Sequence, residues 1–214
     1  MLNMVSSVDG KAATEGKAFA LGSDVDRTVM RTLRSKADAV MVGAGTLRAE
    51  KLSLGLEESS VPQPLAVIAT STGDLPLENL IQSASQELLV VTAQDAPAEI
   101  GDQLAQFSER ASVLRVSKTR SGAPDLLEAL ESLAADHGVQ TLLVEGGPSV
   151  NHALISSTLA DELFLTLAPK LLAGASRDAL NILDGPSLRA INMDLLSLHA
   201  AANELFLRYA LHYY

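Results

Sequence analysis

Two acidic residues stand where an α/β protein would form a ligand-binding crevice. Glu145 directly follows the apolar run 142–144, and Asp9 follows the apolar run 1–5 after a short polar stretch. If both runs are strands of an open α/β sheet, the acids lie near strand carboxyl ends, where such sheets bind ligands. A carboxyl group shielded from water can donate a proton near neutral pH. The alternatives are a surface position for Glu145 and a turn-forming role for Asp9 at its Asp-Gly step.

The residues after Glu145 indicate an anion site at the start of a helix. Two glycines allow a sharp turn and a close approach of a ligand to the backbone. A proline then stands where the first helical position is expected, and an apolar pattern at helical spacing follows it. The first N–H groups of such a helix suit a phosphate oxygen. We therefore predict cofactor contacts at Gly146, Gly147, Pro148, Ser149, Val150 and Asn151.

A second glycine-rich turn, Gly43-Ala44-Gly45-Thr46, also follows an apolar run, residues 38–42. The two turns together could hold a diphosphate between two helix amino-termini, and a simple packing turn is the alternative at Gly43. The chain has no cysteine, and its four histidines show no metal-ligand spacing. Hydride transfer from a bound nicotinamide needs neither a nucleophile nor a metal, so it fits this set of residues.

The elements that must position these residues alternate between strand and helix, which favours a mostly parallel sheet in one α/β domain over residues 1–214. The last two strands indicate an antiparallel hairpin at the carboxyl end. Strands are predicted at 1–5, 38–42, 65–69, 87–92, 111–116, 140–144, 162–167, 195–200 and 204–212. Helices are predicted at 23–35, 46–50, 98–107 and 124–136, with a further one starting at Pro148.

The composition limits the function classes. Hydrophobic residues make up 47% of the 214 residues, which is enough for a sizeable core. The formal net charge of −10 argues against nucleic acid or an anionic membrane surface as a partner. No apolar run approaches the roughly 20 residues of a membrane span, and no signal-peptide pattern is visible. A soluble cytoplasmic protein is therefore expected.

Several segments resemble the reductase domain of the bifunctional riboflavin-biosynthesis deaminase-reductases. They are Ser-Ser-Val-Asp-Gly-Lys at 6–11, the segment 37–46, Val-Glu-Gly-Gly-Pro at 144–148, and the segments 161–163 and 168–172. The zinc ligands of the deaminase domain are absent, so the chain resembles a stand-alone reductase. A more distant similarity to dihydrofolate reductase at the two glycine turns implies a cis peptide bond between Gly146 and Gly147.

The resemblance implies a dihydrofolate-reductase-like three-layer α/β fold and a homodimer. An apolar strand over 205–211 also favours a dimer, because it would be a hazardous exposed edge in a monomer. The implied reaction is the NADPH-dependent reduction of a ribosylamino-pyrimidine phosphate to the ribitylamino form. Family cofactor contacts fall on Val5, Thr46, Glu50, Thr70 and the turn 147–151, and family substrate contacts fall on Asn3, Arg34, Leu54 and Glu145.

Some positions depart from the family pattern. Glu57 stands where an Arg is common, Ala18 where a Ser is common, and Asn3 where a Lys is common. These departures keep open the reduction of dihydrofolate or another pteridine-like heterocycle, and a nucleotide-binding module without turnover. No Arg or Lys adjoins Thr70 and Ser71, where the 2′-phosphate of NADPH is expected, so NADH stays an alternative cofactor.

Overall fold

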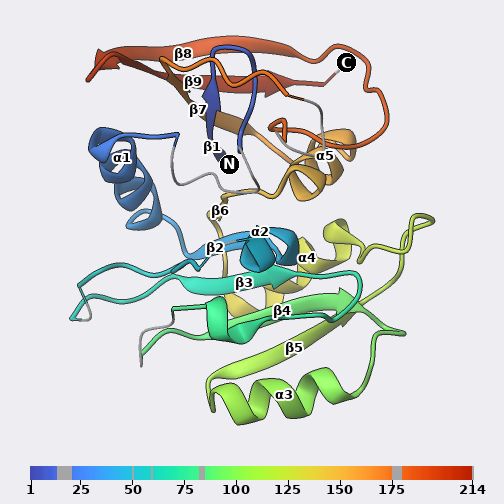
Figure 1. The fold of residues 1–214 in the computed structure, drawn as a ribbon. Helices are drawn as coiled ribbons and strands as arrows, with labels where there is room; N and C mark the ends of the chain where they lie inside the picture. Colours follow the sequence, from blue (N-terminus) through green and yellow to red (C-terminus); the bar gives the residue numbers. More distant parts are fainter. Residues whose placement is uncertain (14–20, 50, 59, 82–84, 175–179, 214) are drawn as a thin grey trace. The chain divides into compact units, whose positions relative to one another are not determined.

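The computed structural model describes residues 1–13, 21–49, 51–58, 60–81, 85–174 and 180–213. The chain divides into two compact units. One consists of Arg34–Leu143, and the other consists of Met1–Leu33 together with Val144–Tyr214. Figure 1 labels the helices and strands of both units. None of the described helices is both long and apolar enough to span a bilayer.

The unit Arg34–Leu143 is built on four parallel strands in the order β5-β4-β3-β2. β2 and β4 are buried along their whole length, as near-continuous apolar runs require in a parallel sheet. The helix α3 packs beside β5 (Figure 1). The elements are β2 (Ala39–Gly43), α2 (Ala44–Ala49), β3 (Leu65–Ala69), the 3₁₀ turn η1 (Leu77–Asn79), β4 (Leu88–Ala93), α3 (Glu99–Phe107), β5 (Ala111–Val116) and α4 (Leu126–His137).

The other unit contains both ends of the chain and carries the antiparallel hairpin. β1 pairs in parallel with β7 and, through Leu2 and Val144, with the end of β6. β9 pairs antiparallel with β7 on one side and with β8 on the other. The elements are β1 (Leu2–Ser7), α1 (Asp24–Arg34), β6 (Leu142–Val144), α5 (Pro148–Ser156), β7 (Glu162–Ala168), β8 (Asn192–Ala201) and β9 (Glu204–His212); the end of α1 and the start of β6 belong to the unit Arg34–Leu143.

These pairings confirm the α/β class, the mostly parallel arrangement and the carboxyl-terminal hairpin. One prediction about the hairpin is wrong: the strand over 205–211 is not an edge, because β9 has a partner on each side. Within the described residues β8 is the outer strand, and all but one of its ten residues are exposed. Ala202 and Asn203 connect the two strands, both with positive φ, as tight hairpin turns require.

The glycine turns differ in detail from the prediction. The peptide bond between Gly146 and Gly147 is cis, as the similarity to dihydrofolate reductase implied, and Gly146 has a φ of 93° that favours glycine. The helix α2 begins at Ala44, two residues before the predicted start, so β2 runs directly into it without a separate loop. With six residues, α2 has fewer than two helical turns.

Candidate active site

The start of α5 has the geometry that the sequence predicts for an anion site. Gly147 occupies the N-cap position and Pro148 the first helical position, where its missing N–H costs no hydrogen bond. The N–H groups of Ser149 and Val150 lie in the first turn, which has no intrahelical acceptors for them. The backbone amides and the helix dipole at this end both favour a negative charge.

Asn151 has a different place from the one predicted for it. Its backbone N–H donates to the carbonyl of Gly147 at 3.0 Å, so it is not among the open amides of the helix start. Its side chain is 1% exposed and donates through Nδ2 to the carbonyl of Ile182 at 3.0 Å. Sδ of Met4 lies 3.1 Å from the same nitrogen. Asn151 therefore ties α5 to β1 and to the segment before β8.

Glu145 and the predicted contacts on β1 belong to this same unit. Glu145 follows β6 directly and is half-buried. Asn3 and Val5 are half-buried residues of β1, and their alternate positions put them on one face of the sheet. In the pairing with β7, Asn3 stands beside Phe164 and Val5 beside Thr166.

The contacts of Asp9 favour its turn-forming role. Its carboxylate accepts a hydrogen bond from the hydroxyl of Ser7 at 2.6 Å, and others from the backbone N–H groups of Leu172 and Ala173 at 3.1 and 2.7 Å. These bonds stabilise the ionised form and lower the pKa of Asp9 to about 2, with the Ser7 hydroxyl as the largest cause. A carboxylate that stays ionised near neutral pH is not suited to donate a proton.

Asp26, an acid in the first turn of α1, is not among the site residues predicted from the sequence. In the structure it is half-buried, and burial is the main reason that the pKa of Asp26 is raised above its ordinary value. The negative charges of Glu204 and Glu145 act in the same direction, whereas the hydroxyl of Thr166 and the charge of Arg27 oppose it. The signal was invisible in the sequence, because Glu204, Glu145 and Thr166 come from three segments distant from α1.

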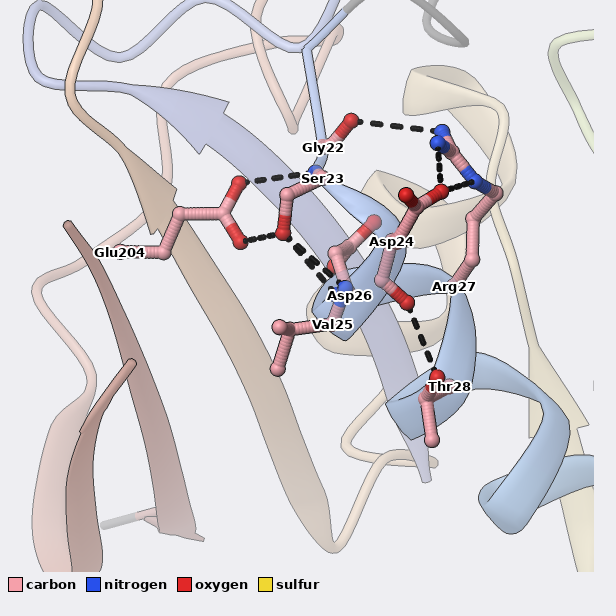
Figure 2. Close-up of polar contacts among 8 residues, drawn as sticks. All are labelled: Gly22, Ser23, Asp24, Val25, Asp26, Arg27, Thr28 and Glu204. Atoms are coloured by element: carbon pink, nitrogen blue, oxygen red, sulfur yellow. Dashed lines mark hydrogen bonds and ion pairs between the residues drawn. The ribbon is translucent and has the colours of Figure 1, made fainter. Parts of the chain in front are cut away.

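A clamp between Glu204 and Ser23 fixes the start of α1 (Figure 2). Glu204 is 2% exposed, and its two carboxylate oxygens accept hydrogen bonds from the backbone N–H and the hydroxyl of Ser23 at 2.9 and 2.5 Å. Oγ of Ser23 in turn accepts from the N–H of Val25 at 3.1 Å, so this hydroxyl caps the start of α1. The first residue of β9 thus determines where the first turn of α1 and Asp26 lie.

The remaining predicted site residues belong to the unit Arg34–Leu143. The guanidinium of Arg34 is buried and donates to the carbonyl of Gly55 at 3.1 Å. The side chain of Leu54 is fully buried, so only its backbone could meet a ligand in this conformation. Oγ1 of Thr70 accepts from the N–H of Gly73 at 3.1 Å, while Ser71 is exposed.

Gly43 ends β2 and the half-buried Thr46 lies in α2, on the same unit as Arg34. Glu50 and Ala18 lie outside the described residues. Because Arg34 donates to the carbonyl of Gly55 and Leu54 is fully buried, both residues stabilise the segment around Gly55.

Comparison with known proteins decides the family. The family model for the RibD C-terminal domain matches residues 1–207. The chain belongs to the RibD C-terminal domain family. It is 30% identical over 197 residues to the 2,5-diamino-6-ribosylamino-4(3H)-pyrimidinone 5′-phosphate reductase of Archaeoglobus fulgidus, covering 87% of this chain and 86% of the relative. It is 26% identical over 216 residues to the reductase of the same name from Methanothermobacter thermautotrophicus, covering 98% of this chain and 96% of the relative.

Solved structures share the fold of this chain. RibD of Acinetobacter baumannii superposes with a TM-score of 0.77 at 21% identity, over 99% of this chain and 57% of that longer chain. A pyrimidine reductase-like protein of Corynebacterium diphtheriae superposes with a TM-score of 0.74 at 23% identity, over 99% of this chain and 91% of the other. The RibD C-terminal domain is a reductase domain, so the chain is placed among the oxidoreductases.

Proposed function

We propose that this chain catalyses the NADPH-dependent reduction of a ribosylamino-pyrimidine 5′-phosphate to its ribitylamino form. The two archaeal relatives carry such a substrate in their names and align over most of their own length. The structural observation that carries the proposal is the turn from Glu145 to Pro148. It brings an acid, a positive-φ glycine and the start of a nine-residue helix together within one compact unit.

The residues at the start of α5 fit the phosphates of a dinucleotide. Ser149 and Val150 offer backbone N–H groups, and Gly146 and Gly147 leave the approach free of Cβ atoms. When bound, NADPH would supply the hydride for the reduction. The family resemblance adds contacts at Val5, Thr46, Glu50 and Thr70. The glycine turn adds Gly43, and the expected position of the 2′-phosphate adds Ser71. NADH is the alternative cofactor because no Arg or Lys adjoins Thr70 in the sequence.

Glu145 is the proposed proton donor to the substrate. The reaction consumes one hydride and one proton, and a carbon–nitrogen group accepts hydride more readily when a proton reduces its electron density. Asp9 is the less suitable donor, because its hydrogen bonds hold its pKa at about 2. The substrate contacts implied by the family are Asn3, Arg34, Leu54 and Glu145.

A homodimer is part of the proposal, with β8 as the surface that a second copy covers. Long apolar side chains stand exposed along this strand: Met193 is 44% exposed, Leu195 53%, Leu196 49% and Leu198 52%. An exposed apolar edge strand invites pairing with another chain, and natural proteins usually cover it. The single reductase domain over residues 1–214 and the cytoplasmic location stay predictions from the sequence.

The experiment that tests the proposal is a spectrophotometric assay of NADPH oxidation with the ribosylamino-pyrimidine phosphate, its deaminated analogue and dihydrofolate in separate reactions. The expected result is oxidation with one of the two pyrimidines and a product that carries two additional hydrogen atoms by mass spectrometry. Oxidation with dihydrofolate alone would support the alternative substrate class. Tight NADPH binding without oxidation in any reaction would support a nucleotide-binding module.

A further inference from the structure

Asp26 lies over the same sheet face as two predicted ligand contacts. Its carboxyl group accepts a hydrogen bond from the hydroxyl of Thr166 on β7, a residue 2% exposed. Thr166 pairs directly with Val5 of β1, and directly paired residues put their side chains on one face of a sheet. Asn3 lies two residues before Val5 and shares that face. Asp26 therefore belongs to the surroundings of the proposed site.

The chain makes room for this carboxyl group at Gly22. A Cβ atom added to Gly22 would overlap the carboxyl group of Asp26, so only glycine leaves the space that Asp26 occupies. The Glu204–Ser23 clamp fixes the same turn from the other side, because Ser23 lies between Gly22 and α1 (Figure 2). Three features therefore fix the position of Asp26: the hydroxyl of Thr166, the space at Gly22 and the Glu204–Ser23 clamp.

The charged and polar groups that act on Asp26 come from four parts of this unit. Glu204 on β9 and Glu145 after β6 bring negative charge, Arg27 on α1 brings positive charge, and Thr166 on β7 brings a hydroxyl donor. Burial is the largest influence and raises the pKa of Asp26, so this group keeps its proton to a higher pH than an ordinary aspartate. A half-buried acid with a raised pKa that interacts electrostatically with a second acid is typical of a site that handles protons.

We propose that Asp26 is the proton store of the site, which holds the proton that the reduction consumes and passes it to Glu145. This inference rests on the proposed function. In that reaction the C1′–O4′ bond of the ribosylamino group breaks as the proton of the amino nitrogen moves to O4′, which leaves a C1′=N bond. C1′ then receives the hydride with its two electrons from NADPH, and the nitrogen receives one proton. Glu145 gives that proton and is recharged from Asp26, which takes a new proton from water. Asp26 acts through Glu145, so it is a positioning residue.

The test compares the pH profiles of kcat for the wild-type chain and four variants. Wild-type kcat should fall as rising pH deprotonates Asp26. Asp26→Asn should lower kcat at least about tenfold and remove that fall, with KM values within about twofold of the wild type. Gly22→Ala should lower kcat similarly, because it displaces the carboxyl group while leaving the acid in the chain.

Thr166→Val distinguishes a proton-handling role of Asp26 from a purely structural one, because a structural role would leave the pH at which kcat falls unchanged. Its hydroxyl lowers the pKa of Asp26, so its loss should shift the fall in kcat to higher pH. Asp24→Asn is the matched control, because Asp24 lies in the same helical turn with its side chain 93% exposed, and its profile should equal the wild type.

If Asp26→Asn keeps the kcat and the pH profile of the wild type, this inference is wrong. It is also wrong if the pH profile of Thr166→Val does not shift. Neither outcome contradicts the proposed function. No turnover by the wild-type chain would overturn the proposed function and this inference with it.

Discussion

The clamp between Glu204 and Ser23 predicts a large loss of stability when the carboxylate is removed. Glu204→Ala deletes two hydrogen bonds, of 2.9 and 2.5 Å, from a residue that is 2% exposed. Hydrogen bonds to charged groups contribute about 1.5–3 kcal/mol each, and Ser23 is part-buried, so water can replace some of the loss. The expected decrease in the free energy of unfolding is about 2–4 kcal/mol, a large share of the ~5–15 kcal/mol of a typical protein.

Urea denaturation followed by far-ultraviolet circular dichroism measures this loss. Asp24→Ala is the control, because Asp24 is an acid of the same helix start that pairs with Arg27 at the surface (Figure 2). An exposed ion pair of this kind should contribute less than about 1 kcal/mol. Glu204→Gln keeps one acceptor oxygen and should fall between the two. If Glu204→Ala costs no more than Asp24→Ala, the clamp does not hold α1, and the argument for the position of Asp26 fails.

Four further outcomes are expected. Glu145→Gln should lower kcat at least about 100-fold while NADPH still binds in a fluorescence titration; near-wild-type kcat across the pH range would refute its role as donor. Gly147→Val should weaken NADPH binding at least about tenfold, whereas Gly101→Ala, at an open helical position, should leave affinity unchanged and add about 0.5–1 kcal/mol of stability. Leu195→Lys on β8 should shift the sedimentation coefficient from dimer to monomer, and a wild-type monomer would contradict the proposed interface. For Asp9, whose pKa is lowered to about 2, the stability difference between wild type and Asp9→Asn should be full above about pH 4 and vanish as the pH falls toward 2.

The fold was largely predictable because its core strands are continuous apolar runs. The bounds of β3 and β5 match the prediction, since each run is flanked by turn residues that break the pattern. The start of α5 was also predictable, because Pro148 marks the first helical position in the sequence itself. Strand order was harder: the apolar run 205–211 predicted a strand but could not show that β8 lies outside β9.

The parts of the site that sequence reasoning missed depend on contacts between distant residues. Ser23 and Glu204 are separated by 181 positions, and no local pattern links them. Asp26 looked like an ordinary acid at a helix start, because its raised pKa arises from burial and from charges on other elements. Asn151 was predicted as an open amide, yet the helix uses its N–H and the core takes its side chain. Local periodicity carries no information about such pairings.

The most direct measurement of the central claim follows the hydride itself. The chain is incubated with the ribosylamino-pyrimidine phosphate and NADPH deuterated at both C4 positions, and the product is analysed by mass spectrometry and proton NMR. The account predicts one deuterium at C1′ of the ribityl chain and none elsewhere, because the nicotinamide reduces that carbon directly. A reduced product without deuterium at C1′ would contradict the account.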